Sequence, residues 1–341
     1  KVDTLVLDVG VNIARQERGM SLELSNREET LEIELRQVAA TEEYEYVLPV
    51  IFHVLYRVPE DDIPVGYLSS CLERVNELYR DGPVDMNLKF VLATHDPNGQ
   101  LLEEPGVRRE FREGLPMDMF DFVGNKFGDC AWIWDPKEYI NVVIFDSKSI
   151  PSGCAHFPYL PESVVLPGVL FSDWYADHLP DAHVHCVAWN RSHMFSRYEL
   201  LGVIFDYDVF TLAHEMGHYL GLLHPFVDGK GNFGDYCDDT PDYCVNGYET
   251  FLSELDETFP YSDDNYRKVI QRVALNGRVF IADNIMDYEF GYLDRFTLEQ
   301  RKRVRTVLEN AWLLPGPKIE VEPWARSGKK AVKPSVPKPV S

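Results

Sequence analysis

The 341-residue sequence lacks any apolar run near the 18 residues that a membrane-spanning helix needs. The chain as given is therefore not expected to cross a membrane. Its first residues, KVDTLVLDVG, also lack the basic start and the long apolar core of an export signal. A secreted chain looks the same once its signal has been removed, so this second absence excludes nothing about secretion.

Basic residues are scarce. Lys and Arg number 33 against 56 Asp and Glu, which gives a formal net charge of -23. A surface of this sign repels phosphate backbones and anionic lipids, so nucleic acid is not an expected partner. With 45% hydrophobic residues, the chain has ample material for a packed core and is expected to be globular.

Cysteine is absent before Cys71, and the sequence contains no CxxC pair that would indicate a structural zinc site. The six cysteines are an even number, so disulfide bonds and free buried thiols both remain open. The most local candidate for a disulfide bond joins Cys237 to Cys244 around the loop CDDTPDYC.

The composition divides the chain into three parts. Residues 1–45 contain alternating stretches, TLVLDVGVNIA and ETLEIELRQV, and we expect a β-rich extension that is either an accessory strand pair or a pro-segment. Residues 46–315 form the expected catalytic domain. Residues 316–341 are rich in Pro and Lys and are typical of an extended or disordered tail.

Within the expected catalytic domain, apolar segments of strand length predict a mixed sheet. VLPVIFHVLY reads as a buried strand and YLSSCLERVNELYR as the helix that backs it, followed by strands at NLKFVLATHD, YINVVIFD and SVVLPGVLFSD. Residues 176–199 are polar and without a clear period, which predicts a long surface insertion. FTLEQRKRVRTVLENAWLL predicts a closing helix with Thr297 as its N-cap and Gln300 three residues later.

The segment TLAHEMGHYLGLLH carries the chemistry. His214 and His218 are four residues apart, so they project from one face of a helix toward one point. Gly221 can adopt a left-handed conformation that ends the helix and lets the chain bring His224 back to the same point. Three neutral imidazoles leave a fourth position for water, which is typical of a catalytic zinc.

Glu215 follows the first of these histidines directly. Its carboxylate can accept the proton of the zinc-bound water and pass it to the leaving amine, while the metal polarises the scissile carbonyl. The residues therefore predict a zinc-dependent endopeptidase that acts on polypeptides. The alternative is a secreted or surface protein-binding module that retains a metal site, and metal-dependent hydrolysis of a small amide is a third possibility.

The pattern HExxHxxGxxH resembles the metzincin signature of zinc peptidases, and NIMDY, which contains Met286 and Tyr288, resembles the methionine-containing turn of that group. VLPVIFHVLY, the DPNG of LATHDPNG, the HPF beginning at His224, and CDDTPDY narrow the resemblance to the pappalysin and cytophagalysin branch, over about residues 47–312. The resemblance implies that Met286 forms the hydrophobic base beneath the metal and that Tyr288 approaches the zinc or the oxyanion.

The same resemblance implies an α+β fold of the metzincin-like zincin type. Its parts are a twisted mixed sheet, a backing helix, the active-site helix, and an irregular lower subdomain that ends in a helix, with the substrate in the cleft between. It also implies calcium in the lower subdomain. The candidate oxygen ligands are Asp235, Asp238, Asp239, Thr240 and Asp242.

Several further readings of the sequence stay open. A second metal at His183 and His185 is conceivable, although surface histidines are the ordinary interpretation. The acidic residues after Met286, namely Asp287, Glu289 and Asp294, suggest that a basic substrate residue is accepted there. If residues 1–45 inhibit, an aspartate such as Asp3 or Asp8 would have to reach the metal, because no cysteine is available.

A peptidase with candidate disulfide bonds and calcium sites is expected to be secreted or extracytoplasmic. Surface anchoring is left open, and no feature of the sequence decides the oligomeric state.

Overall fold

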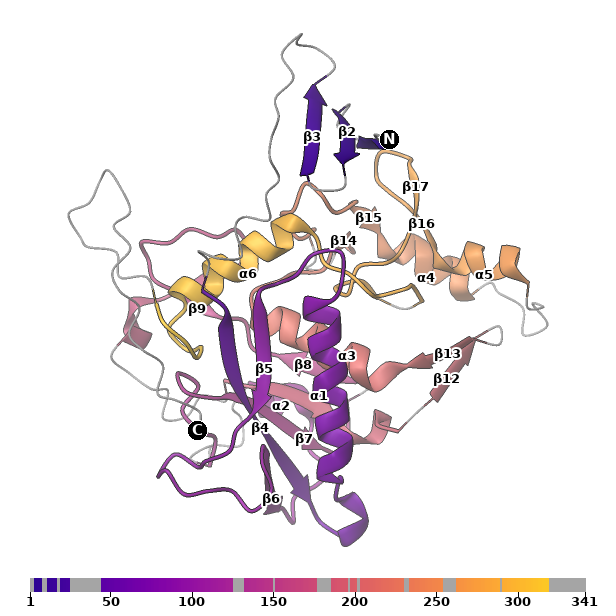
Figure 1. Ribbon diagram of the computed structural model, residues 1–341. Helices are drawn as coiled ribbons and strands as arrows, with labels where there is room; N and C mark the ends of the chain where they lie inside the picture. Colours follow the sequence, from indigo (N-terminus) through magenta and orange to yellow (C-terminus); the bar gives the residue numbers. More distant parts are fainter. Residues whose placement is uncertain are drawn as a thin grey trace. The chain divides into compact units, whose positions relative to one another are not determined.

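The computed structural model describes most of the chain, in two compact units formed by residues 1–45 and 46–341 (Figure 1). The described residues are 3–7, 11–16, 19–24, 44–124, 132–149, 151–176, 185–195, 197–200, 203–229, 233–253, 262–288 and 290–318.

The first unit contains an antiparallel sheet of three strands, in the order β1 (Asp3–Leu7), β2 (Val11–Gln16) and β3 (Gly19–Leu24). The alternating stretch TLVLDVGVNIA supplies the first two of these strands, as its period of two predicts. The second alternating stretch, ETLEIELRQV, lies outside the described residues. Whether this unit is an accessory element or a pro-segment stays a prediction.

The second unit is built on a six-stranded sheet in the order β5-β4-β7-β11-β8, with β6 also paired to β4. All pairs are parallel except β8 with β11, so the sheet is mixed, as expected. The strands are β4 (Tyr46–Tyr56), β5 (Leu88–Leu92), β6 (Val107–Phe111), β7 (Ile140–Phe145), β8 (Gly153–Ala155) and β11 (Val187–Asn190).

Strand β4 is apolar along nearly its whole length because both faces of the sheet are covered. Helix α1 (Val65–Arg80) contacts β5 and helix α3 (Tyr207–Tyr219), and α3 also contacts β8 and β11. Helix α2 (Met119–Val123) packs into a cluster of buried apolar side chains that includes Leu55 and Phe145. The active-site helix is thereby fixed against the edge of the sheet (Figure 1).

The structure corrects two expectations about residues 160–199. Val187–Asn190, expected within a surface insertion, forms the buried strand β11, which pairs with β7 in the sheet. A run of four residues is too short to reveal a strand against polar flanks. Conversely, SVVLPGVLFSD contributes only the exposed two-residue strand β10 (Leu170–Phe171), paired with β9 (Tyr159–Leu160).

The rest of the second unit consists of short elements and a closing helix, α6 (Leu298–Asn310). Thr297 and Gln300 form the predicted capping box at its start. The remaining elements are η1 (Pro59–Asp61), η2 (Asp173–Ala176), η3 (Arg191–His193), β12 (Arg197–Leu200), β13 (Val203–Asp206), β14 (Phe226–Val227), β15 (Tyr243–Cys244), α4 (Val245–Ser253), α5 (Asp263–Ile270), β16 (Gln271–Val273) and β17 (Val279–Ile281). Residues 319–341 lie outside the described residues, and so does nearly all of the expected tail.

Candidate metal centre

Helix α3 ends where the sequence predicts, at a glycine-centred turn. Gly221 has φ +87, and its N–H donates to the carbonyl of His218. The N–H of Leu222 donates to the carbonyl of Gly217, and this pair of bonds defines a Schellman motif. The turn is tied to the closing helix, because Arg303 Nε donates to the Gly221 carbonyl at 2.6 Å.

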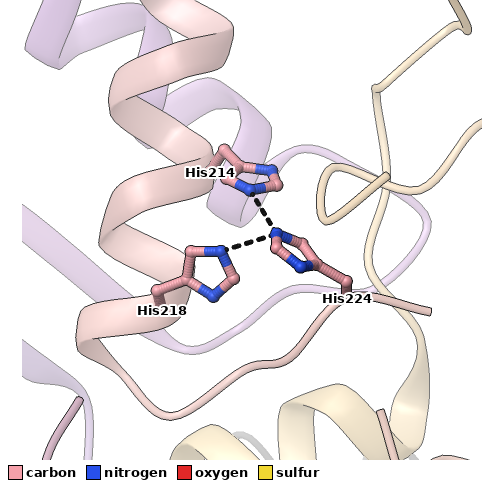
Figure 2. Close-up of side chains that lie close together, drawn as sticks. All are labelled: His214, His218 and His224. Carbon is pink, nitrogen blue, oxygen red and sulfur yellow. Dashed lines mark hydrogen bonds between the residues drawn. The ribbon is translucent and has the colours of Figure 1, made fainter. Parts of the chain in front are cut away.

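The turn brings His224 back to the two helical histidines. Its Nε2 lies 3.2 Å from Nε2 of His214 and 2.9 Å from Nε2 of His218, and Figure 2 shows the three rings pointing toward one another. Within the described residues, these three form the single group of at least three His, Cys, Asp or Glu side chains whose ligand atoms lie within 4.8 Å of one another. The predicted convergence is therefore present.

Backbone carbonyls orient two of the rings. His214 Nδ1 lies 2.9 Å from the carbonyl oxygen of Ile285, and His218 Nδ1 lies 2.8 Å from that of Leu222. A carbonyl only accepts hydrogen bonds, so each Nδ1 carries the proton and each Nε2 presents a lone pair. Imidazole lone pairs directed toward one point are the donors that a metal ion binds, and this donor set fits a metal ion that prefers imidazole nitrogen.

Burial keeps these imidazoles neutral. It lowers the pKa of His214 to about 3, with a further lowering from the nearby charge of His224. The pKa of His218 is also lowered, first by burial and then by the other two histidines. Neutral rings are the form in which histidine binds a metal.

Glu215 lies buried between helix α3 and the edge strand β8, with 8% of its surface exposed. A Cβ placed on Gly153 would lie 2.5 Å from Cγ of Glu215, so this strand position has no room for a side chain. Burial raises the pKa of Glu215 to about 8. A carboxylate with a pKa near neutrality is suited to accept and return protons.

Met286 packs against helix α3, and the ring of Tyr288 lies beside two of the histidine rings. Met286 is fully buried against α3, and its Sδ lies 2.3 Å from where a Cβ on Gly217 would be. The ring of Tyr288 lies 4.5 Å from that of His224 and 5.7 Å from that of His214, centroid to centroid. Its side chain is 40% exposed, so its ring faces the histidines and is also open to solvent.

Sequence reasoning missed the groups that orient the ligands. The carbonyls of Ile285 and Leu222 have no side-chain signature, and Gly153 is one glycine among 22. The ring of Phe226 stacks on that of His224, with 4.6 Å between the ring centroids. Phe226 belongs to the HPF motif, so the sequence did contain a signal for this residue.

The expected calcium ligands do not form a comparable cluster. The two oxygens of Asp235 accept hydrogen bonds from Cys237 N, Thr240 Oγ1 and Gln300 Nε2. Asp239 accepts from the N–H of Glu299, while Asp238 and Asp242 join no metal-binding group within the described residues. Calcium binding by this segment stays a prediction.

The sequence also offered a candidate disulfide bond between Cys237 and Cys244 and a candidate second metal site at His183 and His185. Cys237 and Cys244 are not joined by a disulfide bond, and Cys130 lies outside the described residues. His185 is fully buried beside the ring of Tyr219, and it joins no metal-binding group within the described residues; His183 lies outside them.

The structure describes two of the three acidic residues after Met286, and their acceptance of a basic substrate residue stays a prediction. Asp287 is buried and accepts hydrogen bonds from Tyr243 and from the N–H of Tyr288. Asp294 pairs with Arg295 at 2.9 Å, and Glu289 lies outside the described residues. Position in the sequence alone did not show that Asp287 is buried.

Known proteins resemble this chain in sequence. Residues 129–309, more than half of the 341 residues, match the sequence model of the M43 peptidase family, described as pregnancy-associated plasma protein-A. An extracellular metalloprotease of Verticillium alfalfae is 26% identical over 241 residues, which cover 64% of this chain and 70% of that protein.

Solved structures of mirolysin from Tannerella forsythia resemble the chain in fold. Mature mirolysin in complex with a cleaved peptide has a TM-score of 0.50 at 20% identity, covering 77% of this chain and 91% of that one. A promirolysin mutant has a TM-score of 0.52 at 18% identity, covering 80% and 84%. This likeness confirms the expected mixed-sheet fold.

Proposed function

The chain belongs to the M43 peptidase family and is a metalloendopeptidase, and from this premise we propose that its metal is zinc, held by Nε2 of His214, His218 and His224. The observation that carries the proposal is the convergence of these three nitrogens, two of them fixed as lone-pair donors by backbone carbonyls. Three nitrogen ligands leave a coordination position open for chemistry. When bound, zinc supplies a Lewis acid that polarises the scissile carbonyl and lowers the pKa of water.

Glu215 acts as the general base and acid in this proposal. Its buried carboxylate takes a proton from the attacking water and returns it to the leaving amine. Tyr288 supplies a hydroxyl group beside the histidine rings that can donate to the developing oxyanion. Met286 closes the apolar base beneath the helix and keeps water away from that side.

An extended polypeptide is the substrate that best suits the edge of the sheet. Strand β8 forms one edge of the six-stranded sheet, and its Gly153 packs directly against Glu215. A peptide that adds to this edge by main-chain hydrogen bonds would run past the general base. The absence of a side chain at Gly153 keeps strand and carboxylate close together.

Secretion is also part of the proposal. The Verticillium alfalfae relative is described as extracellular, which supports the same location for this chain. In the part of the chain that the structure describes, no helix has the length and apolarity to span a bilayer. Surface anchoring stays a prediction.

Replacement of the proposed general base tests the mechanism. Glu215→Gln keeps the shape of the side chain but cannot accept a proton, so kcat is expected to fall by about 10²–10⁴-fold or more. Zinc content, measured by elemental analysis, and the melting temperature should stay at wild-type values. Glu309→Gln, on α6, is the control and should retain activity. Undiminished cleavage of a peptide library by zinc-loaded Glu215→Gln would overturn the proposal.

A further inference from the structure

Arg272 is a buried cation that the proposed mechanism does not use. It lies in β16 with 2% of its surface exposed, and it is among the largest fully buried side chains within the described residues. Burying a guanidinium costs free energy unless its donors and charge are satisfied, so its surroundings indicate what it does.

The guanidinium group binds the backbone of the segment that follows Met286. Its Nη2 donates to the carbonyl oxygens of Tyr288 at 3.1 Å and Phe290 at 2.8 Å. Its Nη1 donates to the carbonyl oxygen of Val269 at 3.1 Å, near the end of α5. One planar group thus ties the Tyr288 segment to the α5–β16 junction.

The guanidinium group lies over two tyrosine rings. Its central carbon lies 3.3 Å from the ring centroid of Tyr248 and 5.7 Å from that of Tyr243. Stacking on aromatic faces stabilises a buried arginine and fixes the plane of its donors. A lysine in this cage would keep the charge but lose the fork of donors.

Asp287 holds the other side of the same segment. Its Oδ1 accepts from the N–H of Tyr288 at 2.7 Å and from the hydroxyl of Tyr243, whose ring also faces Arg272. The backbone N–H and C=O of Tyr288 are therefore both pinned by buried, oppositely charged side chains. Its phenol ring is left partly exposed beside His224.

We propose that Arg272 is a positioning residue for catalysis, which fixes the backbone of Tyr288 so that its phenol lies over the histidine centre. The inference rests on the proposed function, in which Tyr288 stabilises the oxyanion. A group that acts in the transition state must be held within a fraction of an ångström, and a displacement of about 1 Å can cost about 10²-fold in rate. Arg272 supplies that precision through the backbone of Tyr288.

The decisive variant is Arg272→Lys, compared with Tyr288→Phe and with the double variant. We expect Arg272→Lys to lower kcat by about 10- to 100-fold with KM within about twofold, because the lost interaction acts on the transition state. In the Tyr288→Phe background the same change should lower kcat less than about threefold, since both changes act through one hydroxyl group.

Arg305→Lys is the matched control. Arg305 is also buried and stacks on a tyrosine, Tyr46, at 4.8 Å, but it lies on α6 and its ring partner is in β4. Arg305→Lys should lower the melting temperature about as much as Arg272→Lys does. Its kcat should stay within about twofold of the wild-type value. If Arg272→Lys does not fold, Tyr243→Phe removes only the hydroxyl bound to Asp287, and should lower kcat several-fold.

A second readout does not depend on activity or on metal. A 3-fluorotyrosine at position 288 should give one sharp fluorine NMR resonance in the metal-free wild-type and Arg305→Lys proteins, and a shifted or split resonance in Arg272→Lys. Unchanged fluorine spectra and a kcat equal to that of Arg305→Lys, while Tyr288→Phe is impaired, would overturn the positioning role alone. An inactive zinc-loaded wild type would instead refute the proposed function, and the fluorine spectra would still decide the placement of Tyr288.

Discussion

The histidine segment 214–224 and the acidic segment 235–242 offer an instructive contrast. Both are dense in side chains that bind metals, and the sequence favours an ion at each of them. In the histidine segment, three ligand nitrogens converge. In the acidic segment, the oxygens of Asp235 accept hydrogen bonds from Cys237, Thr240 and Gln300.

The difference lies in what the lone pairs face. Helical spacing and the turn at Gly221 aim the Nε2 atoms at one another, while carbonyls occupy the Nδ1 sides of His214 and His218. The acidic side chains instead cap backbone N–H groups, such as that of Glu299 at the start of α6. The presence of ligand atoms is therefore a weak indicator of a metal site, whereas donors left facing one another are a strong one.

The largest expected effect comes from removing the third histidine. His224→Ala leaves two nitrogens, and zinc affinity should fall by more than the roughly 10–100-fold typical of losing a hydrogen-bond partner of a ligand, with loss of peptidase activity. Competition with a chelator measures the affinity. His193→Ala, at an exposed histidine in η3, is the control and should bind zinc normally. If His224→Ala bound zinc as tightly as the wild type, the three converging nitrogens would not be what distinguishes the histidine segment from the acidic one.

Gly221→Ala tests whether the turn is what completes the histidine set. An alanine at φ +87 is strained, and its Cβ would lie 2.7 Å from Cγ2 of Val307. We expect a loss of about 2–4 kcal/mol in the free energy of unfolding, together with weaker zinc binding. Gly66→Ala, where a Cβ has nothing within 4 Å, should be neutral or stabilising in the same denaturant titration. Equal behaviour of the two variants would show that the turn is not required.

The smallest effect is expected in the acidic segment. Asp235→Ala leaves the N–H of Cys237 and the hydroxyl of Thr240 without this acceptor, which should cost about 1–3 kcal/mol of stability while zinc content stays unchanged. Asp238→Ala, at an exposed side chain, should stay within about 0.5 kcal/mol of wild type. Adding calcium gives a further test. If calcium raises the melting temperature of the wild type and Asp235→Ala abolishes that rise, the acidic segment holds an ion site and the contrast with the histidine segment is wrong.

Several parts of the molecule follow from local sequence. Strand β4, helix α1 and the capping box of α6 were predicted because each depends on a run of neighbouring residues with a clear period or cap signal. The same holds for the convergence of His214, His218 and His224, which needs only helical spacing and one glycine.

Other parts depend on partners distant in the chain. Strand β11 is recognisable only from its neighbours β7 and β8, since four residues carry no periodic signal. The clamp formed by Arg272 joins backbone atoms 16 and 18 residues away, and nothing in its local sequence marks it as buried. Asp287 shows the same limit, because its buried carboxylate is bound by Tyr243, which lies 44 residues earlier in the chain.

The contact between Arg303 and the carbonyl of Gly221 links residues 82 positions apart. The loop that carries His224 is thus buttressed by the last helix of the domain, so a ribosome must release nearly the whole domain before this support exists. A chain whose synthesis stops before α6 therefore lacks this support for the loop that carries His224.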